Sequence, residues 1–276
     1  MRLDIPYALI DMALKEDFGD CGDVTSQAIF GREETASFQL ICKSDGILCG
    51  FPIFQAVFDR MDPKLVWEVY FREGDLVAKG DRVCAITGSV LTILQAERTA
   101  LNFLSHLSGI ATRTNEFVKA APGKIRILDT RKTLPGFRTL QKYAVSLGGG
   151  LNHRMGLFDM VLIKDNHIDA AGSITSAVEK VRARWGDRFA IEVETRSLEE
   201  VREALACHVE RIMLDNMGDA EMTAAIAIIQ GRCEIEASGN MTRDRLISLN
   251  DMDIDYISFG ELTNRVVPVD FSLIKI

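Results

Sequence analysis

The amino-acid sequence predicts an α/β protein, with a small N-terminal sheet domain followed by a larger domain of successive strand and helix units. Two observations predict the larger domain. From residue 125 onward, short apolar runs of strand length end in a polar residue or glycine, and helical sequence usually follows them. The run ends lie 21 to 35 residues apart, which is the spacing of repeated strand–helix units. They are Asp129, Lys164, Glu194, Asp215, Ser238 and Gly260.

A third observation is the different pattern of the first hundred residues, which predicts a small sheet with one or two helices. Residues 36–50 and 65–90 contain short alternating runs that Gly-Asp pairs interrupt, as turns do. Residues 1–20 are acidic and amphipathic, so we expect a helix there and not a signal peptide. Apolar residues at helical spacing in 93–121 predict a helix that leads into the second domain.

The length of the chain limits the second domain to an open or incomplete barrel. A closed eight-stranded barrel usually takes about 250 residues, whereas only about 150 lie between residues 110 and 265 of this 276-residue chain. We therefore expect six or seven parallel strands in an incomplete barrel, with an open doubly wound sheet as the alternative. The expected domains are residues 1–108 and 109–276, with about the last ten residues packing back on the N-terminal domain.

The composition argues against several classes of function. A formal net charge of −8 and 7% aromatic residues do not suit general nucleic-acid binding. No stretch approaches the roughly 18–20 uninterrupted apolar residues that a membrane helix needs. The cysteines show no C-x-x-C pair and no zinc-ligand spacing, so we expect reduced thiols in a cytoplasmic protein. They are Cys21, Cys42, Cys49, Cys84, Cys207 and Cys233.

Positive charge gathers near the first two run ends. Between residues 126 and 164, Lys and Arg outnumber acids seven to two, although the whole chain is acidic. Arg138 and Lys142 follow a helical pattern, and we expect them on a solvated helix face. The other candidates lie at the carboxyl ends of strands, where parallel strand–helix units bind ligands; they are Arg131, Lys132, His153, Arg154 and Lys164. Such a cluster suits a polyanionic ligand with carboxylate or phosphate groups.

The later run ends carry acids and glycines. Glu192 and Glu194 alternate with apolar residues, so both can point to one face of their strand, and Asp215 ends the following run. These carboxylates can coordinate Mg²⁺ and hydrogen-bond sugar hydroxyls; helix capping or pairing with neighbouring cations is the alternative. Gly239 and Gly260 lie at turns where backbone amides can bind phosphate. A phosphorylated sugar and an acidic acceptor are therefore the expected substrates.

Longer motifs add a family resemblance. The chain contains, in this order, LDTRKTLPG, GGGLNHRMGLFDMVLIKDNHI, EVET, RIMLDNM, EASGN and ISFGELT. In order and spacing these motifs resemble the quinolinate phosphoribosyltransferase family, also called nicotinate-nucleotide pyrophosphorylase (carboxylating). The segments EDFGDCGDVTS and ILQAERTALNFLSHLSGIAT extend the resemblance over nearly the whole chain. It implies an N-terminal α/β sandwich domain joined to an open, barrel-like α/β domain, in a homodimer or larger assembly with active sites at the subunit boundary.

The resemblance also implies roles for residues of these motifs. With Thr130 nearby, the residues that would hold the quinolinate carboxylates are Arg131, Lys132, His153, Arg154 and Lys164. Those that would contact phosphate are Ser238, Gly239, Asn240 and Gly260. Glu194 and Asp215 would hold the ribose hydroxyls and Mg²⁺, the implied cofactor, and Arg98 would reach the site from the neighbouring subunit. The expected catalytic residues are Lys132, Lys164, Glu194 and Asp215.

The implied reaction transfers the 5-phosphoribosyl group from phosphoribosyl pyrophosphate to the nitrogen of quinolinate, with loss of the 2-carboxylate as CO₂. Nicotinate mononucleotide, an intermediate of NAD biosynthesis, and pyrophosphate are the other products. Two positions depart from the usual motif: Glu261 stands where a small residue is common, and Asn264 where a histidine or another basic residue is often found. Both departures concern the binding of phosphate and pyrophosphate, for which Arg265 would be a substitute donor.

Three other functions are compatible with the same residues. A related phosphoribosyltransferase could use another acceptor, such as nicotinate or the substrate of the molybdenum-transport-associated relative. A Schiff-base aldolase would place its lysine at a strand end, as Lys164 is placed. A carrier or regulator could bind a phosphorylated or dicarboxylic metabolite without turnover. The full cationic set around NHRMG and LIKDNH favours quinolinate.

Overall fold

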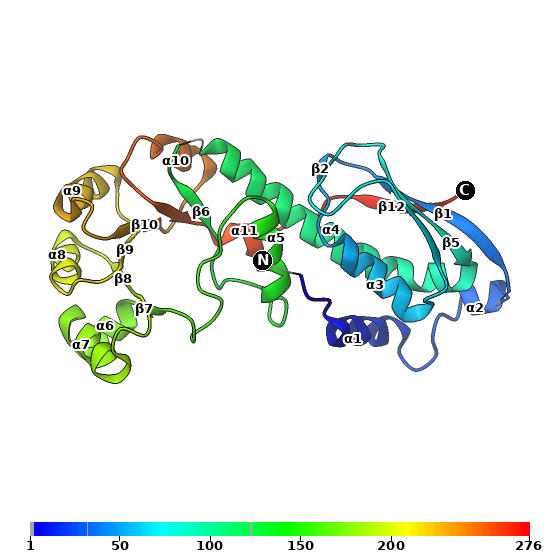
Figure 1. Cartoon of the computed structure of the whole chain (residues 1–276), viewed down its shortest axis with the longest axis horizontal. Coiled ribbons are helices and arrows are strands. Elements are labelled where there is room, and N and C mark those ends of the chain that lie inside the picture. Colours follow the sequence, from blue (N-terminus) through cyan, green and yellow to red (C-terminus); the bar gives the residue numbers. More distant parts are fainter. Residues whose placement is uncertain (1–2, 32, 122) are drawn as a thin grey trace. The chain divides into compact units, whose positions relative to one another are not determined.

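The chain folds into two compact units. A computed structural model describes residues 3–31, 33–121 and 123–276 (Figure 1). Unit 1 comprises residues 1–113, 143–148 and 265–276. Unit 2 comprises residues 114–142 and 149–264. Within these described ranges, no helix has both the length and the apolar character to cross a membrane.

Unit 1 contains a four-stranded antiparallel sheet in the order β12-β1-β5-β3. Its strands are β1 (Thr35–Cys42), β3 (Val66–Val69), β5 (Arg82–Ser89) and β12 (Phe271–Lys275). The C-terminal strand β12 lies beside β1, as the red and blue arrows of Figure 1 show. A second, two-stranded ribbon pairs β2 (Gly46–Ile47) with β4 (Leu76–Val77). The small N-terminal sheet domain that the sequence predicts is therefore confirmed.

Aromatic side chains pack helix α3 (Phe51–Met61) against the sheet of unit 1. Phe51, Phe54 and Phe58 recur at helical spacing and therefore share one face of α3. Their ring centroids lie 5.6–6.4 Å from that of Trp67 in β3. The other helices of this part of the chain are α1 (Tyr7–Phe18), α2 (Ser26–Ile29) and α4 (Val90–Ala120), the last of which continues into unit 2.

Unit 2 contains a six-stranded parallel sheet in the order β6-β11-β10-β9-β8-β7. Its strands are β6 (Arg126–Leu128), β7 (Val161–Ile163), β8 (Ile191–Thr195), β9 (Arg211–Asp215), β10 (Glu234–Ser238) and β11 (Tyr256–Ser258). Strands β7 to β11 are neighbours in sequence order, and β6 then pairs with β11. This is the order of a barrel that is left open between β6 and β7. The predicted incomplete barrel is confirmed, and it has six strands.

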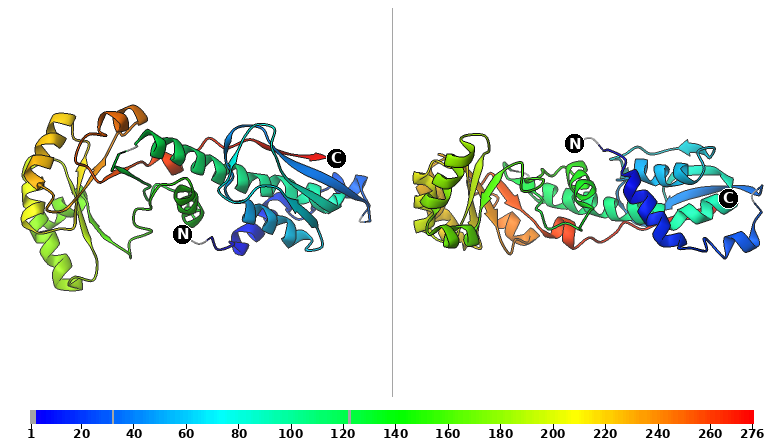
Figure 2. Two further views of the ribbon diagram at one scale, coloured as in Figure 1. Left: turned by 45° about the horizontal axis from the view of Figure 1, so that its top comes forward. Right: turned by 90° about the horizontal axis from the view of Figure 1, so that it is seen from below.

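The helices of unit 2 follow its strands. They are α5 (Arg138–Leu147), α6 (Asp165–Ala171), α7 (Ile174–Trp185), α8 (Leu198–Ala206), α9 (Asp219–Ile229), α10 (Arg243–Ser248) and α11 (Glu261–Asn264); the last residues of α5 belong to unit 1. Ser173, Ser197 and Thr242 begin α7, α8 and α10, because their hydroxyls accept backbone N–H groups of the first turn. Figures 1 and 2 show α7, α8 and α9 on one face of the strands.

The opposite face of the strands carries polar side chains at matched levels. Glu194 of β8 and Glu236 of β10 are both in register with Met213 of β9, so these three residues lie side by side. Asp215 and Ser238 are paired one level further toward the carboxyl ends. Because alternate residues of a strand share a face, this register places acids and hydroxyls together at one edge of the sheet.

Candidate active site

A cavity of about 630 Å³ lies at the carboxyl ends of the strands of unit 2. Most of the residues that the sequence predicts for the site line it; they are Thr130, Arg131, Lys132, His153, Arg154, Lys164, Glu194, Asp215, Ser238, Gly239 and Asn240. The cavity is also lined by residues that the sequence analysis did not select, which are Leu162, Met213, Asn216, Glu236 and Ser258. Strand ends far apart in the sequence are thus brought together in one place.

Three predicted residues do not line this cavity, and one of them, Glu192, is fully buried. Arg98 is exposed on α4, in unit 1. Gly260 follows β11 and contacts the stem of Lys132: a Cβ atom on Gly260 would lie 2.9 Å from Lys132 Cδ. The absence of a side chain at position 260 therefore makes room for Lys132, which does line the cavity.

Two arginines give one side of the cavity its positive charge. Arg131 follows β6, and Arg154 lies in the segment between α5 and β7. Their Nε atoms are buried and have no hydrogen-bond partner among the described residues. Burial and the nearby Arg131 guanidinium lower the pKa of Arg154. Two like charges held together with unsatisfied donors are stabilised by an anion, so this geometry favours an anionic ligand.

Lys164 faces the acid at the end of the neighbouring strand. Its Nζ donates to Glu194 Oε2 at 2.8 Å, and its side chain is 44% exposed. Lys164 is also the N-cap of α6, and its backbone N–H donates to His167 Nδ1 at 2.9 Å. His167 therefore fixes the backbone from which Lys164 reaches the cavity.

The loops after β9 and β10 are joined by amide side chains. Asn216 Nδ2 donates to Asp215 Oδ2 at 2.7 Å, and Asn216 Oδ1 accepts from Asn240 Nδ2 at 3.0 Å. Asn216, Gly239 and Asn240 all have positive φ angles, of 55°, 86° and 48°. This backbone turns the two loops toward each other and holds the Asp215 carboxylate in place. Asn216 directly follows Asp215, but the sequence analysis predicted only Asp215 for the site.

Gly239 is required by both its backbone angle and its surroundings. A Cβ atom there would lie 2.3 Å from Asn216 Oδ1, whereas a Cβ on Gly231, also at positive φ, would meet nothing within 4 Å. We expect Gly231→Ala to lower the free energy of unfolding by about 1–2 kcal/mol, because of the left-handed backbone alone. Gly239→Ala should lower it further in urea unfolding, since Asn216 must also move. Equal losses for the two variants would contradict this role of Asn216.

A buried ion pair lies beneath the cationic side of the cavity, and it corrects one prediction. The sequence predicts Lys142 on a solvated helix face, but its side chain is fully buried and pairs with Asp129. Lys142 Nζ also donates to the backbone carbonyl of His153 at 2.8 Å. Asp129 accepts further hydrogen bonds from Asn152 Nδ2 at 2.7 Å and from the His153 backbone N–H at 2.9 Å.

This ion pair fixes the segment that carries His153 and Arg154. The prediction for Lys142 is wrong because its partner, Asp129, lies on another element and is not visible in a local helical pattern. Arg138, predicted on the same solvated face, is half-buried: its Nε donates to Thr133 Oγ1 at 3.0 Å and its Nη1 to Met155 O at 3.2 Å. Both cations of α5 therefore hold loops in place.

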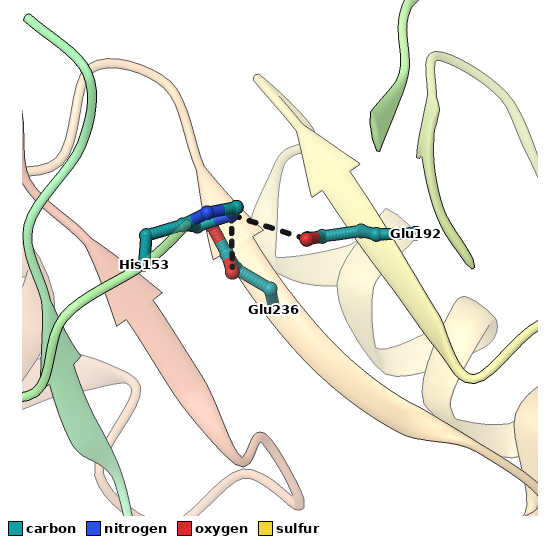
Figure 3. A group of neighbouring side chains, drawn as sticks. All are labelled: His153, Glu192 and Glu236. Atoms are coloured by element: carbon teal, nitrogen blue, oxygen red, sulfur yellow. Dashed lines mark ion pairs between the residues drawn. The ribbon is translucent and has the colours of Figure 1, made fainter. Parts of the chain in front are cut away.

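His153 turns both ring nitrogens into the protein. Its Nδ1 accepts the backbone N–H of Arg154 at 2.7 Å. Its Nε2 lies 3.1 Å from Glu192 Oε2 and 3.5 Å from Glu236 Oε2 (Figure 3). Burial lowers the pKa of His153, against the opposing effect of Glu236. The ring therefore lines the cavity while its hydrogen-bonding atoms face the two glutamates.

Glu236 is the acid of this site that sequence reasoning missed. It alternates with Ile235 and Ala237 just as Glu192 and Glu194 alternate with their apolar neighbours. The same period-two argument therefore contained a signal for it, two residues before Ser238. Glu192 and Glu236 are both fully buried.

Comparisons with known proteins identify the family of the chain. Residues 110–274 match the family model "Quinolinate phosphoribosyl transferase, C-terminal domain", and residues 23–108 match the model of its N-terminal domain. The chain is 43% identical to "Nicotinate-nucleotide pyrophosphorylase [carboxylating], chloroplastic" of Arabidopsis thaliana over 96% of this chain and 81% of that protein. It is 42% identical to "Probable nicotinate-nucleotide pyrophosphorylase [carboxylating]" of Synechocystis sp., over 97% and 93%.

A solved structure shows the same fold over the whole chain. The crystal structure of NadC from Streptococcus pyogenes is 40% identical and covers 100% of this chain and 99% of that one, with a TM-score of 0.95. The strand order, the cationic cavity and the matches over both parts of the sequence lead to one conclusion. The chain belongs to the quinolinate phosphoribosyltransferase family.

Proposed function

We propose that this protein transfers the 5-phosphoribosyl group of phosphoribosyl pyrophosphate to the nitrogen of quinolinate and releases the 2-carboxylate as CO₂. The products are nicotinate mononucleotide and pyrophosphate, in NAD biosynthesis. The observation that supports this most directly is the pair of guanidinium groups of Arg131 and Arg154, whose buried Nε atoms have no hydrogen-bond partner among the described residues, in a cavity that also holds Lys164, Glu194 and Asp215. The named relatives carry this activity in their names.

The cationic side of the cavity suits an acceptor with two carboxylates. Arg131 and Arg154 each offer a planar fork, and Lys132 and Lys164 add point charge. A dianionic acceptor balances two guanidinium groups, whereas nicotinate brings one carboxylate and leaves one of them unpaired. The pairing of Lys164 with Glu194, in a chain of this transferase family, gives no support to a Schiff-base aldolase or to a simple carrier.

The acidic side suits the phosphoribosyl donor. We assign the ribose hydroxyls to Glu194 and Asp215 and the 5-phosphate to the turn of Ser238, Gly239 and Asn240, which line the same cavity. Carboxylate oxygens on two adjacent strands are ligands of the kind that Mg²⁺ accepts, with water completing its coordination. Bound Mg²⁺ would supply positive charge for the pyrophosphate that leaves.

These residues act by binding and orientation. As pyrophosphate departs, the sugar carbon gains positive charge, and the carboxylates of Glu194 and Asp215 stabilise it while they hold the ribose. The arginines hold the acceptor so that its pyridine nitrogen lies close to that carbon. The entropy cost of bringing the two reactants together is then met by binding, before the chemical step. No covalent bond between the protein and the sugar is required. We also propose a homodimer, in which the exposed Arg98 of one subunit contributes to the site of the other. We place the protein in the cytoplasm, where the six free cysteines would stay reduced.

The proposal is tested by following nicotinate mononucleotide by mass spectrometry. Purified protein is incubated with phosphoribosyl pyrophosphate, Mg²⁺ and quinolinate, with nicotinate replacing quinolinate in a parallel reaction. We expect product from quinolinate alone, and loss of that product when EDTA removes the metal. Equal product from both acceptors, or from nicotinate only, would assign the cavity to a different acceptor.

A further inference from the structure

The second half of the proposed reaction requires an acid that the residues assigned so far do not include. When CO₂ leaves the ribosylated acceptor, the electron pair of the broken bond stays on ring carbon C2, next to the positively charged nitrogen. That carbon must then take up a proton. The four basic residues of the cavity are assigned to the carboxylates of the acceptor; they are Arg131, Lys132, Arg154 and Lys164. The following inference rests on the proposed function and names the group that supplies this proton.

Glu236 lies among the residues to which the acceptor is assigned. It lies on β10 and lines the same cavity as Arg131 and Arg154, yet its side chain is fully buried. Its Oε1 atom is enclosed and has no hydrogen-bond partner among the residues that the structure describes. Its Oε2 atom accepts a long hydrogen bond from Arg211 Nη1 at 3.4 Å. One oxygen of Glu236 is therefore anchored, and the other has no hydrogen-bond partner among the described residues.

The surroundings of Glu236 favour the neutral acid. Burial, together with the Glu192 carboxylate of β8, raises the pKa of Glu236 to about 8, and the same burial raises the pKa of Glu192 to about 7. His153, Ser258 of β11 and Arg211 of β9 oppose the shift of the Glu236 pKa. A carboxyl group whose pKa is raised in this way keeps its proton at neutral pH and loses it as the pH rises through about 8.

A metal ion does not explain this cluster. Ligand atoms of His153, Glu192 and Glu236 lie within 4.8 Å of one another, which suits a divalent cation in distance alone. However, His153 Nδ1 accepts the Arg154 backbone N–H, so in the neutral ring the proton is on Nε2. That nitrogen is the one that faces the glutamates (Figure 3). A protonated Nε2 cannot coordinate a metal, so we assign no cation to this cluster.

We propose that Glu236 is the general acid that protonates C2 of the pyridine ring after CO₂ has left. The bond between C2 and its carboxylate breaks, CO₂ departs, and the electron pair remains on C2. The O–H bond of Glu236 then breaks, its proton forms the new C2–H bond, and its electron pair stays on the carboxylate. Arg211 stabilises this carboxylate, and water returns the proton when nicotinate mononucleotide leaves.

Glu236→Gln tests the assignment, because glutamine has nearly the same shape and can accept or donate hydrogen bonds but cannot release a proton. General acids contribute roughly 100-fold or more to rates, so we expect formation of nicotinate mononucleotide to fall at least 100-fold. Quinolinate affinity should stay within about threefold of wild type, since the arginines remain. Rapid-quench mass spectrometry should show one pyrophosphate released per site and accumulation of the ribosylated dicarboxylate, because CO₂ loss without protonation is reversible.

Glu234→Gln is the matched control. Glu234 lies on the same strand but is exposed and contacts Arg211 and Tyr256 outside the cavity. We expect its turnover to equal that of wild type. In wild type, turnover should fall as the pH rises through about 8, the pKa of Glu236. Turnover of Glu236→Gln should not show this fall.

Three results would overturn the assignment. The first is turnover of Glu236→Gln within threefold of wild type. The second is a pH profile of the variant that still falls above about pH 8. The third is loss of both quinolinate binding and the pyrophosphate burst, which a purely structural role would predict. A wild-type protein that makes no nicotinate mononucleotide from quinolinate would overturn the proposed function as well. An active wild type with an equally active variant would overturn the role of Glu236 alone.

Discussion

Arg154→Ala should lower the turnover of quinolinate at least 100-fold while the protein stays folded, and Arg131→Ala and Lys164→Ala should do the same. A 100-fold loss corresponds to about 2.7 kcal/mol of transition-state stabilisation. Each charge-assisted hydrogen bond contributes about 1.5–3 kcal/mol, and a guanidinium fork can make two of them. The Nε atoms of both arginines are buried and have no hydrogen-bond partner in the described part of the chain, so substrate oxygens would replace no existing hydrogen bond of these atoms.

Steady-state kinetics and thermal melting together check this prediction. Arg154→Lys keeps the charge but loses the fork, and we expect it to recover only part of the activity. Arg202→Ala is the matched control, because Arg202 is 57% exposed on α8 and contacts only Glu199 and Leu198 of its own helix in the described contacts. Wild-type turnover in Arg154→Ala would show that the cavity does not hold the acceptor there.

Lys142→Met should be the most destabilising of these substitutions, by about 3–5 kcal/mol, because it leaves a buried carboxylate without its counterion. Lys142 and Asp129 are both fully buried. Burial raises the pKa of Asp129, and the Lys142 ammonium is the main effect that opposes the rise. Loss of the ammonium would therefore either bury an unpaired charge or force Asp129 to take up a proton. In both cases the His153 carbonyl would lose the hydrogen bond that it accepts from Lys142 Nζ.

Urea unfolding of the variant measures this loss. Lys180→Met, on the exposed face of α7, is the control and should change the free energy of unfolding by less than about 0.5 kcal/mol. Combining Lys142→Met with Asp129→Asn should recover part of the stability, since the unpaired charge is removed. A change below 1 kcal/mol for Lys142→Met alone would contradict the importance of this pair.

The strands of unit 2 could be predicted because each leaves a local mark. A parallel strand buried on both faces is a short apolar run, and its end is a change to polar residues or glycine. In the structure, each of the six strands of unit 2 ends within two residues of the predicted run end. The convergence of Arg131, Lys164, Glu194 and Asp215 then follows from the geometry of parallel strands, and one cavity does hold them.

What the sequence could not predict depends on contacts between distant elements. Lys142 shares a helical pattern with exposed residues, and only the fold places Asp129 against it. The sequence pattern predicts His153 as a further cation that binds the ligand. In the structure, its ring nitrogens instead face Arg154, Glu192 and Glu236. Arg98 came from the family resemblance alone, because an exposed helical arginine has no local signal of function.

We expect one cavity to couple ribosyl transfer to the loss of a particular carboxylate. The most direct test uses quinolinate labelled with ¹³C in the 2-carboxylate, and a second sample labelled in the 3-carboxylate. We predict that labelled CO₂ comes only from the first sample, in equal amounts with pyrophosphate and nicotinate mononucleotide. Label released from the 3-carboxylate, or pyrophosphate formed without CO₂, would contradict this account of the site.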